Sequence, residues 1–106
     1  MPSMNKWTGI GRLTRDVEMR YTAEGKAVAS FTLAVDRDYG SDTTDFINVI
    51  AWERQAETCA EYISKGSLVA VDGRLQIRNY NDKEGSKRIA AEIVAKSVVF
   101  LDKKGE

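Results

Sequence analysis

Histidine is absent from this sequence, and cysteine occurs only once, as Cys59. A zinc site needs several thiolate or imidazole ligands, so the sequence predicts neither a metal site nor any other cofactor. A lone cysteine also excludes an internal disulfide, and because free cysteine is usually buried, Cys59 is expected to pack in the core. Without histidine, a second thiol or a recognisable pair of carboxylates, the sequence carries no catalytic constellation, and we do not expect an enzyme.

The sequence also lacks a long apolar run and an excess of charge of either sign. No stretch reaches the roughly 20 residues that a membrane helix requires, and the N-terminus has no hydrophobic signal region, which predicts a soluble, cytoplasmic protein without a membrane partner. Sixteen basic residues balance sixteen acidic ones, and the sequence pI is about 6.3. This balance argues against binding of nucleic acid through a general positive field. The length predicts a single domain over residues 1–106, with its core over about 5–101.

A long hairpin over residues 67–94 dominates the pattern that is present. Residues 68–80 alternate between two faces, which is typical of a strand with one buried side. The side expected to be buried carries Val69, Val71, Gly73, Leu75 and Ile77. Residues 81–86 are rich in turn formers, so the chain should reverse there and return from Lys87 as the second strand.

Three further strands are predicted from alternation, over residues 5–13, 27–37 and 45–52. Residues 17–22 continue the first of them in extended form. A helix is predicted over residues 53–65 from a stripe of small side chains at Ala56, Cys59, Ala60 and Ile63. Gly66 is expected to cap its C-terminal end in a left-handed conformation. The alternation shifts late in the chain, which predicts a bulge or a bend near Lys96.

Rings and cations share the outward faces of two strands. On the hairpin, Arg74 and Arg78 alternate with the core row and Tyr80 ends it, an arrangement that suits a charged polymer with stackable groups. In the strand before the helix both rows are largely apolar, and Phe46 and Trp52 belong to the same row. Either this row is exposed, or a helix or a second subunit covers it.

The order of elements is three strands, one helix and a two-stranded hairpin. Five strands with a helix between the third and the fourth is the element order of the OB-fold, a small and partly open barrel. Closure into a barrel also avoids the two exposed edges of a flat sheet. We therefore expect an all-β, five-stranded OB-fold barrel with one α-helix between strands 3 and 4.

Five segments resemble the bacterial single-stranded DNA-binding protein family in content, order and spacing. They are residues 12–16, 27–35, 45–49, 65–69 and 72–80, and the similarity runs from about residue 5 to 101. The resemblance implies an OB barrel that assembles as a homotetramer and is wrapped by single-stranded DNA in replication, recombination and repair. It also implies that bases stack on four aromatic residues, which match Tyr39, Phe46, Trp52 and Tyr80.

Stacking on a ring is worth roughly 1 to 3 kcal/mol per base, and it does not select sequence because every base has a π-face. Cations between the rings would hold the phosphates. The candidates are Arg74, Arg78 and Arg88 on the hairpin, with Arg54 and Arg37 as weaker ones.

The sequence departs from the family pattern in three places. Trp7 stands in a strand that usually carries aliphatic residues and helps to pair subunits, so it is a packing anchor, an interface residue or a further stacking platform. The loop of residues 38–44 is short. Many family members continue through a linker to an acidic tip that recruits other proteins, whereas this sequence stops at Glu106. Recruitment of partners by a C-terminal tip is therefore not expected.

Two alternatives stay open at this point. A primosome-type OB adaptor would also bind single strands, but as a dimer whose main task is contact with other proteins. An OB module that binds protein or oligosaccharide would not need the outward row of cations on the hairpin.

Overall fold

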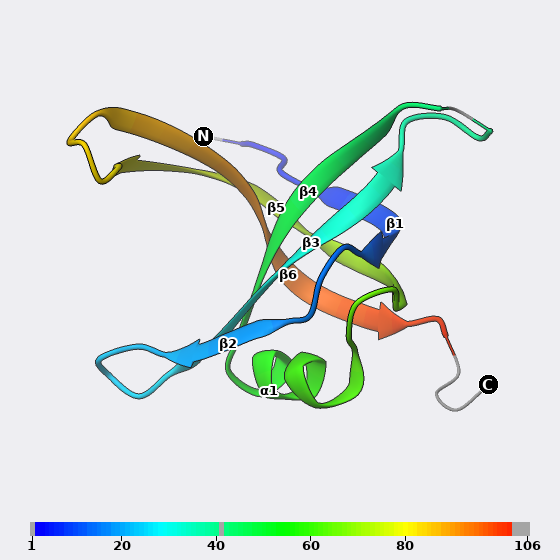
Figure 1. Ribbon diagram of the computed structural model, residues 1–106, viewed down its shortest axis with the longest axis horizontal. Helices are drawn as coiled ribbons and strands as arrows, with labels where there is room; N and C mark the ends of the chain where they lie inside the picture. The colour runs from blue at the N-terminus through cyan, green and yellow to red at the C-terminus, as the bar shows by residue number, and fades with distance from the viewer. Residues whose placement is uncertain (1, 41, 103–106) are drawn as a thin grey trace.

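The computed structural model describes residues 2–40 and 42–102. In chain order the elements are β1 (Trp7–Leu13), β2 (Glu18–Tyr21), β3 (Ala27–Asp36), β4 (Thr44–Trp52), α1 (Glu53–Tyr62), β5 (Leu68–Asn81) and β6 (Lys87–Phe100). The predicted helix between two long strands is confirmed (Figure 1). The expectation for the chain end falls mainly on residues 103–106, which lie outside the described residues.

The strands form one sheet that closes on itself. Their order is β1-β5-β6-β4-β3-β2, and β1 also pairs with β3, so the five long strands make a ring. The first predicted strand is divided in two. β1 pairs with β5, and its last two residues also pair with β3, whereas β2 pairs with β3 alone. The predicted OB-type barrel is confirmed, with β2 as a short extension of its wall.

The core is filled by one row of side chains from each strand. β3 contributes Ala29, Phe31 and Leu33, β4 contributes Val49 and Ala51, and β5 contributes Val69 and Val71. Helix α1 closes one end of the barrel with Ala56 and Cys59, and Ile63 just after the helix is also buried; of the predicted stripe, only Ala60 is exposed. Desolvation raises the pKa of the Cys59 thiol to about 11, so this side chain is a neutral packing residue at physiological pH.

The helix is shorter than predicted, because backbone groups beyond it find other partners. It ends at Tyr62. The Ser64 N–H donates to Ser67 Oγ at 3.0 Å, and the Lys65 N–H donates to Asp16 Oδ1 at 2.8 Å. Gly66 does have a positive φ of 90°, but it lies in the turn closed by the hydrogen bond from Ser67 N–H to Ser64 O, so the predicted helix cap is wrong.

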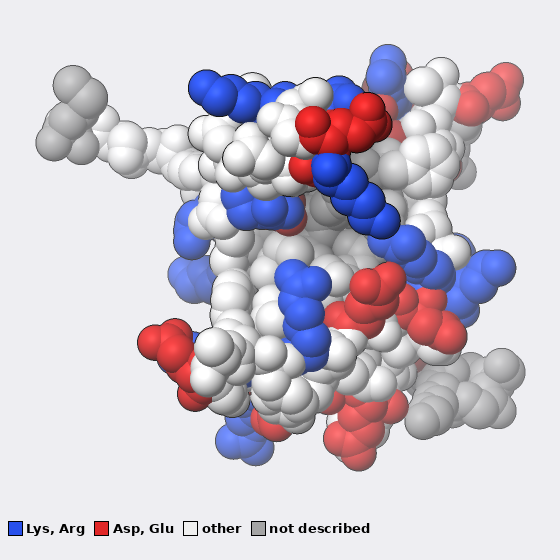
Figure 2. All heavy atoms as spheres, turned by 60° about the vertical axis from the view of Figure 1, so that its left-hand side comes forward, with Lys and Arg blue, Asp and Glu red and all other residues white. Residues whose placement is uncertain are grey.

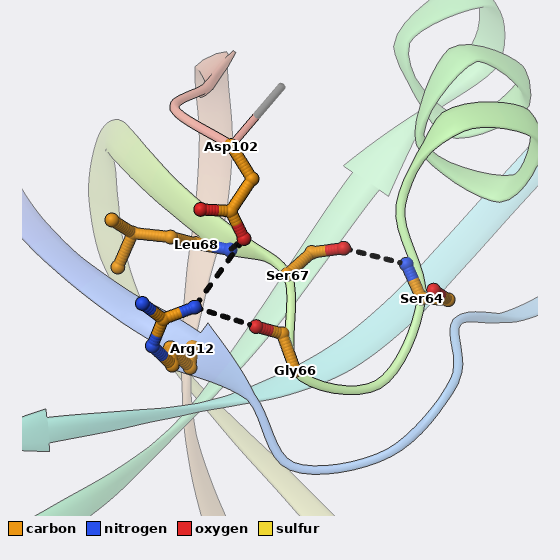
Figure 3. Close-up of polar contacts among 6 residues, drawn as sticks. All are labelled: Arg12, Ser64, Gly66, Ser67, Leu68 and Asp102. Carbon is orange, nitrogen blue, oxygen red and sulfur yellow. Dashed lines mark hydrogen bonds and ion pairs between the residues drawn. The ribbon is translucent and has the colours of Figure 1, made fainter. Parts of the chain in front are cut away.

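Arg12 of β1 connects this turn to Asp102, which follows β6 (Figure 3). Arg12 of β1 donates to Gly66 O at 2.9 Å and to Asp102 Oδ2 at 3.3 Å. The same carboxylate oxygen accepts from the Leu68 N–H at 2.9 Å. These bonds hold the end of β6 beside the start of β5, where the Leu101 N–H also donates to Leu68 O.

The hairpin of β5 and β6 projects beyond the barrel (Figure 1). Leu75 and Ile77, which alternation placed in the core, are 44% and 54% exposed. The reason is the length of β1, which pairs with β5 only as far as Gly73. Beyond that point β5 has only β6 as a strand neighbour, although the Asn5 side chain still bonds the N–H and C=O of Leu75 at 2.9 and 2.7 Å.

The bulge predicted near Lys96 is confirmed. Asp72 pairs with Ser97 while Gly73 pairs with Ala95, so Lys96 is the extra residue of β6. The strands approach closely here, since a Cβ on Gly73 would collide with the carbonyl of Val94.

A sharp joint connects β4 to α1. Trp52 still has extended backbone angles, and the next residue, Glu53, has a φ of 55°. Among the described residues, no other non-glycine residue has a positive φ. A side chain held in this conformation costs on the order of 1–3 kcal/mol, and such strain is often stored beside functional residues.

We predict that Glu53→Gly is more stable than Glu53→Ala by about 1 kcal/mol, because glycine adopts a positive φ without the Cβ penalty. Both variants remove the same carboxylate from the first turn of α1, so their difference isolates the backbone effect. Urea unfolding of the two variants measures it. Equal midpoints would show that the joint is not strained.

Candidate nucleic-acid interface

The outward row of β4 carries two rings. Its inward row, Ile47, Val49 and Ala51, packs in or against the core, so Phe46 and Trp52 point outside. Phe46 is 67% and Trp52 is 41% exposed, which means that no element of the described chain covers the row. Trp52 stands six positions after Phe46, roughly 20 Å along the strand.

A polar row crosses four strands between these rings. Register places Thr32 of β3 opposite Asn48 of β4, Asn48 opposite Glu92 of β6, and Glu92 opposite Gln76 of β5. The Thr32 hydroxyl donates to Asn48 Oδ1 at 3.0 Å. The outer face is therefore continuous from β3 to the hairpin. Sequence reasoning missed Asn48 and Glu92, because their place in this row follows from strand pairing and not from their spacing.

Arg78 and Tyr80 form one unit with Glu92. The guanidinium of Arg78 donates twice to the Glu92 carboxylate, at 3.1 and 3.2 Å, and lies 5.1 Å from the centroid of the Tyr80 ring. Glu92 is buried. Its hydrogen bond and its charge raise the pKa of Arg78. Arg78 thus neutralises a buried carboxylate and supports the ring by a cation–π contact.

Two other candidate cations are also paired with carboxylates. Arg88 Nε donates to Asp82 Oδ2 at 2.9 Å, and the other oxygen of Asp82 accepts the N–H groups of Glu84 and Ser86 in the hairpin turn. The bond from Arg88, followed by that from Ser86, lowers the pKa of Asp82. Arg37 is bonded through Nε to both oxygens of Asp45, at 3.1 and 3.2 Å. A phosphate at Arg88 or Arg37 would therefore compete with an internal anion.

Arg74 and Arg54 are different. Arg74 donates to the neutral amide of Gln76 at 3.0 Å, and within residues 2–40 and 42–102 neither arginine is paired with a carboxylate. Figure 2 shows the side of the molecule on which the hairpin comes forward: Lys and Arg side chains surround a central hollow, and Asp and Glu lie among them. The face has no uniform sign.

The remaining two rings lie apart from the β4 row. Tyr39 is fully exposed in the loop after β3, next to Asp38 and near Asp36 and Asp42, and Figure 1 shows this loop splayed away from the hairpin tip. Trp7 is half-buried against the core, and a Cβ on Gly9 would collide with its ring. Of the alternatives left open for Trp7, the packing role fits this position.

Other kinds of site receive no support in the described part of the chain. Its residues include no helix that is long and apolar enough to cross a membrane. Residues 2–40 and 42–102 also bring together no group of three potential metal ligands.

Comparison with known proteins gives a consistent result. A sequence model of the Single-strand binding protein family matches residues 4–101. The single-stranded DNA-binding protein of Halalkalibacterium halodurans is 49% identical over 106 residues, which cover 96% of this chain and 63% of that protein. Single-stranded DNA-binding protein A of Bacillus subtilis is 50% identical over 105 residues, which cover 95% and 61%. Single-stranded DNA-binding protein 1 of Staphylococcus aureus is 51% identical over 105 residues, which cover 95% and 67%. The chain thus spans about two thirds or less of the length of the first two relatives.

Proposed function

Because the chain belongs to the single-strand binding protein family, we propose that it binds single-stranded DNA without sequence preference. The observation that carries this proposal is the exposed row of Phe46 and Trp52 on a continuous outer face. The proposed task is coating of single strands during replication, recombination and repair in the cytoplasm. It is binding, with no chemical step.

Bases stack on Phe46 and Trp52 in this proposal, and Tyr80 extends the path toward the hairpin tip. Each stacked base contributes roughly 1 to 3 kcal/mol. Arg54 and Arg74 meet the phosphates directly, because no carboxylate of the described chain occupies them. Arg78, Arg88 and Arg37 contribute only where a phosphate replaces their carboxylate partner. Tyr39 is a weaker platform, because a phosphate beside it would approach the neighbouring aspartates.

We also propose that copies of the chain associate through the opposite part of the outer face. Ile10 of β1, Ala70 of β5 and Val99 of β6 are neighbours in register, and Ile10 and Val99 are 57% and 51% exposed. An apolar row across three strands favours contact with a second sheet. This supports the homotetramer that the family resemblance implies.

The first test is a titration of the protein with a homopyrimidine oligonucleotide, followed by tryptophan fluorescence. We expect strong quenching, because a base stacks on Trp52, and weakening with salt as phosphate contacts are lost. Duplex of the same length should bind far more weakly, since the rings of a paired base stack are not accessible. An unchanged spectrum at low salt would rule out the proposed function.

Trp52→Ala should weaken binding by about 1 to 3 kcal/mol, the stacking contribution of one base, without changing the assembly state. Fluorescence anisotropy of a labelled oligonucleotide measures this, since the variant loses the intrinsic probe. Tyr62→Ala is the matched control, because Tyr62 is also an exposed ring but stands at the end of α1 and pairs with Phe100 of β6. Equal affinities for the two variants would make Trp52 a packing residue.

Light scattering tests the assembly. About four copies of the 11.8 kDa chain are expected, and Ile10→Asp should lower the mass by placing a charge in the apolar row. A mass of two copies for the unmodified chain would favour the primosome-type adaptor. A mass unaffected by Ile10→Asp would place the contact elsewhere.

A further inference from the structure

Lys96 occupies a position that no pattern of aromatic or cationic residues identified. It is the extra residue of the β6 bulge, and it is exposed. A bulge turns a side chain out of the regular alternation, and such features are frequent next to binding sites. The shift of alternation predicted the bulge but could not show what its side chain faces.

Strand register brings the part of β6 that carries Lys96 beside the end of β4 that carries Trp52. β4 and β6 run parallel, with Asn48 paired to Glu92 and Ile50 paired to Val94 on the outer face. Two residues farther along the two strands stand Trp52 and Lys96. The two strands separate at this point, because β4 ends and α1 begins. Lys96 of β6 therefore stands beside the end of the strand that carries Trp52.

Lys96 also separates two surface hollows that contain the unpaired arginines. One hollow is lined by Arg54 and Gln55 at the start of α1 together with Lys96. The other is lined by Lys96, Arg74, Asp72 and Lys6. From Trp52, the order across the surface is therefore Arg54, Lys96 and Arg74.

These three cations are available to an external anion. In the described residues no carboxylate forms an ion pair with any of them. The carboxylate that lines the second hollow, Asp72, is held by Lys6 at 3.0 Å. This contrasts with the hairpin tip, where Arg78 and Arg88 are both bound to acids.

Gln55 fixes the bulge in place. Its Nε2 donates to Ala95 O at 3.3 Å, and its Oε1 accepts from the Val98 N–H at 2.9 Å. The amide thus bonds backbone groups on both sides of Lys96, just beyond Val94, where the pairing of β6 with β4 ends. Gln55 belongs to the first turn of the helix that follows Trp52. Its two bonds therefore connect the backbone beside Trp52 to the backbone beside Lys96.

We propose that Arg54, Lys96 and Arg74 form a phosphate track that guides the backbone of a single strand from Trp52 to the edge of β5. The inference rests on the proposed function. It adds Lys96 as a binding residue, Gln55 as the residue that positions it, and a course for the backbone beyond Trp52 toward the base of the hairpin, in addition to the stacking path toward Tyr80.

The test measures affinity for a labelled homopyrimidine oligonucleotide as a function of salt for the unmodified chain, Lys96→Gln, Lys96→Arg and Arg54→Gln. Lys65→Gln is the control, since it removes the same charge from the turn after α1 and not from the track. Each lost phosphate contact should reduce the slope of log K against log salt by about 0.7 for single strands. Lys96→Gln and Arg54→Gln should each show this reduction, whereas Lys96→Arg and Lys65→Gln should keep the original slope.

The outcomes separate this inference from the proposed function. If the unmodified chain binds and both Lys96→Gln and Arg54→Gln keep its slope, the track is wrong while single-strand binding stands. If the unmodified chain does not bind, both are wrong. Circular dichroism of each variant checks that the barrel is intact, which is expected because Lys96 and Arg54 are exposed.

Discussion

Closure of the sheet is the constraint on which the other features of this molecule depend. In a closed barrel every strand has one inside and one outside, and successive residues alternate between them. Val49 and Ala51 are fully buried, so the residues that alternate with them in β4 face outward. Phe46 and Trp52 are exposed for this reason, and not because either ring is unfavourable in a core. In a small barrel, the residues that pack in the interior thus determine which side chains lie on the outer surface.

Most of the barrel was predictable because alternation is a local property. The strand limits, the buried stripe of α1 and the bulge at Lys96 all follow from residues close in sequence. The exposure of Leu75 and Ile77 was not predictable, since it depends on where a distant strand, β1, stops pairing. The partners of the hairpin arginines were hidden for a similar reason: Glu92 stands fourteen residues from Arg78. The sequence could identify candidate aromatic residues, but it could not show which arginines are free of a carboxylate partner.

Ion pairs on the outer face match the balance of basic and acidic residues in the sequence. Arg37, Arg78 and Arg88 are each bonded to a carboxylate on a neighbouring strand or turn. The exposed pairs of Arg37 and Arg88 add little to stability, with a median near 0–1 kcal/mol, whereas Arg78 compensates the charge of the buried Glu92. Their effect is on orientation: the acid keeps the long side chain in one position and, at Arg78, keeps it against the ring of Tyr80. The face therefore carries paired charges of both signs beside exposed rings, and it has no uniform positive field.

Irregular backbone is concentrated around Trp52. Glu53 immediately after it has a positive φ, Gln55 clamps the neighbouring strand, and Lys96 is the bulged residue that this clamp holds. The positive φ of Glu53 and the bulge at Lys96 are each unfavourable, since strain and lost strand pairing cost free energy that a regular barrel would not lose. Together they allow a strand to end in an exposed ring, a helix to start at once behind it, and a cation to stand beside it. A ring at the end of a regular strand would be free to turn with its frayed backbone. Here α1 begins directly after the ring, and Gln55 of that helix bonds the bulged strand beside it, so the backbone that carries Trp52 is held on two sides.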